Sequence, residues 1–92
     1  MRHRTLGRTG FPVSEMACGL WGMSGWSGSD DQESLRTLQL CVDLGCNFFD
    51  TAWAYGEGKS DTFLGKILAA NPDKRLYSAS KIPPKNQQWP AL

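Results

Sequence analysis

The sequence predicts an α/β fold built around a parallel sheet, and two observations carry the prediction. Three short apolar runs, at residues 16–20, 46–50 and 76–80, begin about 30 residues apart, which is the length of one strand–helix–strand unit. A segment with helical apolar periodicity separates each pair of runs. Because parallel strands need a crossover connection, this alternation favours parallel strands joined by right-handed crossovers.

An N-terminal β-hairpin is expected before the sheet. Gly7 and Gly10 bracket a turn, and Phe11-Pro12-Val13 resumes an extended path, so residues 1–14 are predicted to form two antiparallel strands. The first apolar run comes next. It is followed by residues 21–28, which are rich in Gly, Ser and Trp and indicate a loop.

The first helix is expected to begin after Ser29. Ser29 and Gln32 fit a capping box, with Asp30 and Asp31 suited to the positive end of the helix dipole. Gly45 stands where a left-handed C-terminal cap is expected. The apolar face of this helix is predicted to contain Leu35, Leu38, Leu40, Cys41, Val42 and Leu44.

The second helix is expected to begin at Ser60, which can cap it, with Asp61 in its first turn. Asn71-Pro72 ends it, because proline disfavours helical backbone in the residue before it. Its predicted apolar stripe is Phe63, Leu64, Ile67 and Leu68.

Composition narrows the function classes. Hydrophobic residues make up 40% of the 92 residues and charged residues 21%, which indicates a globular protein, and the net charge of +1 gives no reason to expect nucleic acid or an anionic membrane as a partner. The chain lacks a membrane-length apolar run and an N-terminal signal peptide, so a cytoplasmic protein is expected. Cys18, Cys41 and Cys46 lack zinc spacing, so we expect packed, reduced thiols and no metal site.

Two architectures begin with this element order. A (β/α)8 barrel needs ~250 residues, so the chain would supply three of its strands after the hairpin. A flavodoxin-like or Rossmann sheet also begins βαβαβ. The dinucleotide-binding version carries Gly-x-Gly-x-x-Gly after a strand, whereas Gly19-Leu20-Trp21-Gly22 has a different spacing.

Three polar residues follow the ends of predicted neighbouring strands: Asp50, Tyr55 and Lys81. In a barrel this end of the strands carries the active site. A nearby ammonium stabilises a phenolate, so Tyr55 could act as the acid, Lys81 as its electrostatic partner and Asp50 as the residue that orients Lys81. Each also has a plain structural interpretation: a turn cap, a half-buried loop aromatic and a solvated lysine.

Tryptophans in the loops at the same end could wall an apolar substrate pocket, or could simply pack between loops. They are Trp21, Trp26 and Trp53. His3 lies in the predicted hairpin, away from this end, and is not expected to be catalytic.

Three segments resemble the aldo-keto reductase family. Residues 6–14 resemble its opening hairpin, and residues 45–56 contain the signature G-x-x-x-x-D-T-A-x-x-Y-G. Ser80-Lys81 resembles the strand end that carries the family's catalytic lysine. The resemblance extends from residue 1 to about residue 84.

The resemblance implies a (β/α)8 barrel that reduces aldehydes and ketones to alcohols with NADP(H), or possibly NAD(H), bound without a Rossmann fold. By position, Tyr55 would donate the proton, Lys81 would lower its pKa, and Asp50 would pair with Lys81. Gly19, Leu20 and Trp21, together with Asp50, would lie beside the cofactor. The expected partner is a small-molecule carbonyl substrate.

The resemblance also implies that residues 1–92 are the N-terminal part of a single barrel domain, truncated after the third strand. The family's fourth catalytic residue, a histidine, would lie beyond it, so the 92-residue chain alone is expected to be inactive. Two alternatives stay open: a non-catalytic NADP(H)-binding regulatory subunit of the same fold, and a different fold with a chance motif.

Overall fold

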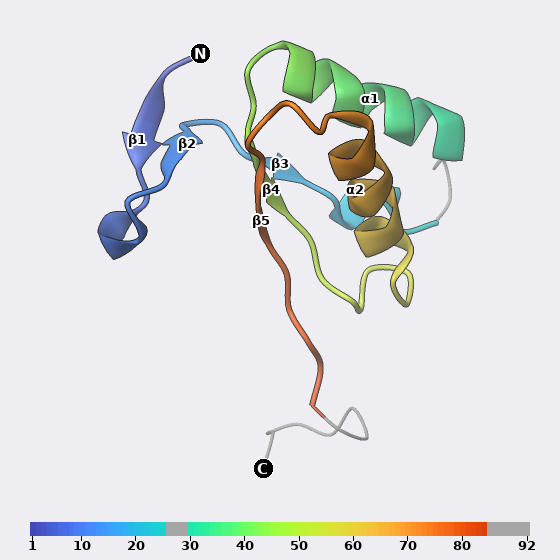
Figure 1. Ribbon diagram of the computed structural model, residues 1–92. Helices are drawn as coiled ribbons and strands as arrows, with labels where there is room; N and C mark the ends of the chain where they lie inside the picture. Colours follow the sequence, from blue (N-terminus) through green and yellow to red (C-terminus); the bar gives the residue numbers. More distant parts are fainter. Residues whose placement is uncertain (26–29, 85–92) are drawn as a thin grey trace.

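The computed structural model describes residues 1–25 and 30–84 (Figure 1). Two short antiparallel strands are followed by three parallel strands and two α-helices, in the order expected. The elements are β1 (His3–Thr5), η1 (Gly7–Thr9), β2 (Pro12–Ser14), β3 (Cys18–Gly19), η2 (Trp21–Met23), α1 (Asp31–Asp43), β4 (Phe48–Asp50), α2 (Lys59–Ala70) and β5 (Tyr77–Ala79).

The sheet has the order β3-β4-β5, with parallel pairing throughout, so the predicted α/β fold is confirmed. In this register Asp50 lies beside Gly19 on one side and Ala79 on the other. Figure 1 shows α1 and α2 packed together next to the sheet, with β1 and β2 set apart from them. The C-terminal ends of the three strands therefore meet at one edge, which is where the candidate site lies.

The core forms between the sheet and the two helices. Phe49, at the centre of β4, and Leu20, just after β3, are fully buried, as is Leu38 of α1. The rest of the cluster is Val42, Cys46, Phe63, Leu64 and Ile67. The predicted apolar face of α1 was too wide, because Leu40 and Leu44 are 56% and 64% exposed.

Both helices begin at residues other than those predicted. Asp30 caps α1, where its carboxylate accepts a hydrogen bond from the Glu33 backbone N–H, so the capping box expected at Ser29 was placed one residue early. Gly58, in a left-handed conformation, precedes α2. Ser60 is fully buried inside α2 and its hydroxyl donates to the Leu20 carbonyl at 2.8 Å.

The end of α1 matches the sequence prediction. Gly45 has φ of 100°, which glycine adopts without the strain that a Cβ causes. The Gly45 N–H bonds to the Val42 carbonyl and the Cys46 N–H bonds to the Cys41 carbonyl, which is the Schellman pattern. This turn directs the chain from α1 into β4.

The hairpin docks at the N-terminal ends of the strands. Asn47, just before β4, accepts from the Ser14 N–H at 2.6 Å and donates to the Pro12 carbonyl at 2.8 Å. Phe11 stacks on Tyr77 at the start of β5, with ring centroids 4.6 Å apart. His3 lies in this hairpin, at the end of the sheet opposite Asp50.

Cysteine placement fits the expectation of packed thiols. All three cysteines are free, and the Cys41 thiol lies 3.9 Å from the Cys18 sulfur. Burial, with added repulsion from Cys41, raises the pKa of Cys18 to about 12. Across residues 1–25 and 30–84, no cluster of His, Cys, Asp and Glu could hold a metal ion. No helix among these residues is long and apolar enough to cross a bilayer.

Candidate active site

The predicted catalytic residues gather at the C-terminal edge of the sheet. Asp50 is the last residue of β4, and Lys81 follows β5 by two residues. Tyr55 lies in the loop between β4 and α2. Adjacent parallel strands bring their C-terminal ends together, so residues distant in sequence become neighbours here.

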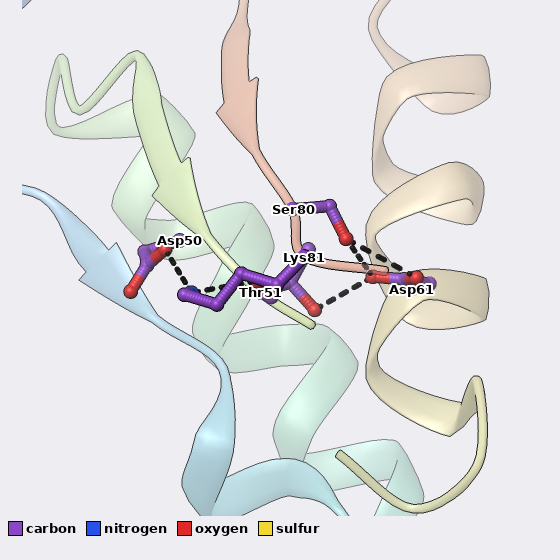
Figure 2. A network of polar contacts seen from close by, with 5 residues as sticks. All are labelled: Asp50, Thr51, Asp61, Ser80 and Lys81. Atoms are coloured by element: carbon purple, nitrogen blue, oxygen red, sulfur yellow. Dashed lines mark hydrogen bonds and ion pairs between the residues drawn. The ribbon is translucent and has the colours of Figure 1, made fainter. Parts of the chain in front are cut away.

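Lys81 and Asp50 form an ion pair. The Lys81 Nζ lies 2.8 Å from Asp50 Oδ1 and also donates to the Thr51 carbonyl at 3.0 Å (Figure 2). The hydrogen bond to Asp50, followed by the attraction between the two charges, raises the pKa of Lys81 above its ordinary 10.5. Lys81 is therefore a cation whose position is defined by two acceptors on one strand end.

Tyr55 completes the group. The Lys81 Nζ lies 5.5 Å from the centroid of its half-buried ring, within the range of a cation–π contact. A hollow of about 200 Å³ adjoins the ring, and it is lined by Ala52, Ala54, Tyr55, Lys81, Ile82 and Pro83. A small molecule in this hollow would therefore lie against the side chains of Tyr55 and Lys81, mainly against their apolar atoms.

Backbone hydrogen bonds fix the loop that carries Tyr55. The Thr51 N–H donates to Ala79 at 2.8 Å and the Trp53 N–H donates to Lys81 at 3.0 Å, so the sheet-like pairing continues past β4. Gly56 has φ of 70°, and a Cβ at this position would lie 2.7 Å from the Ser24 carbonyl oxygen. Only glycine allows this close approach between the two loops.

A second polar network adjoins the ion pair, and residue spacing alone does not predict it. The Asp61 carboxylate in the first turn of α2 accepts from the Thr51 hydroxyl at 2.8 Å and from the Ser80 hydroxyl at 3.2 Å (Figure 2). Thr51 and Ser80 adjoin Asp50 and Lys81 in the chain. The sequence signal for this network is the position of Thr51 and Ser80 inside the two motif segments, whereas Asp61 is predicted only as a residue of the first turn of the second helix.

The residues predicted to contact a cofactor differ in exposure. Gly19 is exposed, with no atom near the position of an added Cβ, and the next residue but one, Trp21, is 62% exposed. Leu20 between them has no exposed surface, and its N–H and carbonyl bond to Asp50 and Ser60. The Leu20 side chain is part of the core, so in this loop Gly19 and Trp21, and not Leu20, are placed to contact a ligand directly.

The predicted tryptophan-walled pocket does not coincide with the hollow beside Tyr55. Neither Trp21 nor Trp53 lines this hollow, and Trp26 lies outside the described residues. Trp53 is 37% exposed and its indole lies against Gly58, so it packs within its own loop. Small residues and the segment after β5 form the wall instead.

Comparison with known proteins gives a consistent result. The model of the Aldo/keto reductase family matches residues 15–91. Aldo-keto reductase YhdN of Bacillus subtilis (strain 168) is 34% identical over 70 residues, covering 74% of this chain and 21% of that protein. A rice protein (Oryza sativa subsp. japonica) named "Probable voltage-gated potassium channel subunit beta" is 37% identical over 68 residues, covering 74% and 20%.

Solved structures agree with the sequence relatives. The holo form of aldo-keto reductase AKR11C1 from Bacillus halodurans superposes with a TM-score of 0.78 at 30% identity, covering 91% of this chain and 26% of that one. The hairpin, three strands and two helices are thus part of a (β/α)8 barrel, as predicted. The chain spans about a fifth to a quarter of the length of these relatives. It belongs to the aldo/keto reductase family.

Proposed function

We propose that this chain is the N-terminal part of a barrel enzyme that reduces aldehydes or ketones to alcohols with NADP(H), and that Tyr55 donates the proton. The observation that carries the proposal is the position of the Lys81 Nζ, 2.8 Å from the Asp50 carboxylate and 5.5 Å from the Tyr55 ring centroid. A fixed cation beside a phenol that borders a hollow suits proton donation to a bound carbonyl.

Each residue of the group has a distinct part in this reaction. The Tyr55 hydroxyl donates its proton to the carbonyl oxygen as that oxygen gains negative charge. The Lys81 ammonium stabilises the phenolate that remains, and Asp50 keeps the ammonium in place. A nicotinamide cofactor, when bound, would supply the hydride for the carbonyl carbon. Hydride plus proton convert the carbonyl to an alcohol.

The residues present fit one end of such a cofactor. The β3–β4 register sets exposed Gly19 beside Asp50, whose side chain is 46% exposed. Gly19 lets a flat ring approach the backbone closely, and the exposed Trp21 offers an apolar surface next to it. Leu20 acts indirectly, by anchoring this loop in the core. The preference for NADP(H) over NAD(H) would be determined by the residues that bind the adenosine end of the cofactor.

Two features support a longer barrel domain. The described part of the sheet pairs β3 and β5 on one side each, so both have an edge available for a further strand. Met16, Leu40 and Leu44 are more than half exposed, as expected of apolar residues that further elements would cover.

The free thiols suit a reducing compartment, and we propose that the protein is cytoplasmic.

A second function has a specific observation in its favour, namely the 37% identity to the protein named as a potassium channel subunit beta. In that case the barrel would bind NADP(H) as a regulatory subunit without useful turnover. Loss of NADPH absorbance with 4-nitrobenzaldehyde, measured on the complete protein that carries this chain, separates the two. Turnover supports the reductase, whereas tight NADPH binding without turnover favours the subunit.

A further inference from the structure

We propose that Asp61 is a positioning residue for the catalytic group, because it holds the two strand ends that carry Asp50 and Lys81. The inference rests on the proposed function. Asp50 and Lys81 both lie at the ends of sheet strands, whereas Asp61 is a third charged residue that comes from α2.

The carboxylate of Asp61 joins three elements. Its Oδ1 accepts hydrogen bonds from Thr51 Oγ1 at 2.8 Å and Ser80 Oγ at 3.2 Å, and its Oδ2 lies 3.4 Å from the same Ser80 oxygen. Figure 2 shows the carboxylate on α2 facing the ends of β4 and β5. One side chain therefore sets the distance between the two strand ends and the helix.

Thr51 transmits this restraint to the ammonium. Its hydroxyl is bonded to Asp61, while its carbonyl accepts from the Lys81 Nζ at 3.0 Å. Thr51 follows Asp50 directly and is only 1% exposed, so water cannot easily replace Asp61 as the partner of its hydroxyl. Displacement of Thr51 would move both acceptors of the Lys81 ammonium at once.

Ser80 provides the matching restraint on the other strand. It immediately precedes Lys81, and its hydroxyl bonds to Asp61 rather than to its own strand. Backbone bonds already tie Thr51 to Ala79 and Trp53 to Lys81, which fixes the two strands relative to each other. The additional effect of Asp61 is to fix this pair of strand ends relative to α2, and with it the loop that presents Tyr55.

The test uses the complete barrel protein. Asp61→Ala removes every acceptor, Asp61→Asn keeps one acceptor oxygen, and Asp73→Asn is a control at an exposed carboxylate outside this network. We expect Asp61→Ala to lower kcat about ten- to hundredfold while the KM for NADPH changes little, because a small misplacement of catalytic groups costs that much. Asp61→Asn is expected to recover part of the loss, and Asp73→Asn to match wild type.

A second readout separates positioning from simple stabilisation of α2. Because Asp50 raises the pKa of Lys81, nitrogen NMR of the Lys81 ammonium reports directly on their contact. In Asp61→Ala this pKa should move back towards 10.5 at temperatures where the protein stays folded. An unchanged Lys81 titration together with unchanged kcat would overturn the proposal. If the wild-type protein shows no turnover, the proposed function fails, and the NMR titration alone still decides whether Asp61 positions Lys81.

Discussion

The Lys81 Nζ lies 2.8 Å from Asp50 Oδ1, although 31 positions separate the two residues in the chain. The contact exists because β4 and β5 are neighbours in a parallel sheet and end at the same edge. Both side chains remain about half exposed. An exposed pair contributes little to stability, and in the proposed function its role is to place the ammonium beside Tyr55.

Asp50→Asn should therefore affect activity much more than folding. Without the carboxylate the ammonium loses its charged acceptor, and we expect kcat of the complete protein to fall at least about tenfold with only a small change in Tm. Asp31→Asn is the matched control, because it removes an exposed ion pair with Lys59 at 2.9 Å outside the site. Equal kcat in the two variants would contradict the role of Asp50.

The raised pKa of Lys81 gives a pH prediction. Its folded-state pKa lies above 10.5, so the pair with Asp50 contributes in full below pH 10.5 and is lost as pH rises through the folded-state value. An NMR titration of the ammonium should show it fully protonated at pH 9 and titrating above 10.5. In Asp50→Asn the transition should shift to lower pH; titration of wild type below 10.5 would show that the pair does not form.

The buried hydrogen bond from Ser60 to Leu20 should be structurally important. Ser60→Ala leaves the Leu20 carbonyl, in a fully buried residue, without its donor, which we expect to cost about 1–3 kcal/mol of unfolding free energy. Thr62→Val is the control two residues further along α2, since its exposed hydroxyl donates to the carbonyl of Gly58, the residue just before this helix. Denaturant unfolding of the complete protein measures both, and similar losses would refute the prediction.

Replacing glycine by alanine should change the free energy of unfolding in opposite directions at Gly56 and Gly65. Gly56→Ala forces a Cβ to within 2.7 Å of the Ser24 oxygen at a positive φ, so a loss of more than about 1 kcal/mol is expected. Gly65 lies in α2 with no atom near its added Cβ, so Gly65→Ala should stabilise the protein by about 0.5–1 kcal/mol. Thermal unfolding of both variants checks the difference in sign.

Periodicity and spacing predicted most of the fold and the contact between Asp50 and Lys81. The apolar runs at residues 16–20, 46–50 and 76–80 became β3, β4 and β5, because a parallel sheet covered by helices needs short apolar strands. Asp50 and Lys81 could be paired in advance, since strand order alone brings their ends together.

Features that depend on tertiary contacts could not be predicted from the sequence pattern. Ser60 has the residue type of an N-terminal cap, but its hydroxyl instead donates a hydrogen bond to the buried Leu20 carbonyl, which would otherwise lack a side-chain donor. Leu40 and Cys41 look alike in periodicity, yet Leu40 is 56% exposed because the core takes only one side of α1. Asp61 joins Thr51 and Ser80 through contacts that no sequence spacing reveals.

In the proposed function, Tyr55 donates the proton in carbonyl reduction. The most direct test is NADPH-dependent reduction of 4-nitrobenzaldehyde by the complete protein and its Tyr55→Phe variant, with NADPH binding measured in parallel. Removing one hydroxyl should lower kcat at least about 10²-fold and leave the affinity for NADPH nearly unchanged. Undiminished turnover in Tyr55→Phe would contradict the account.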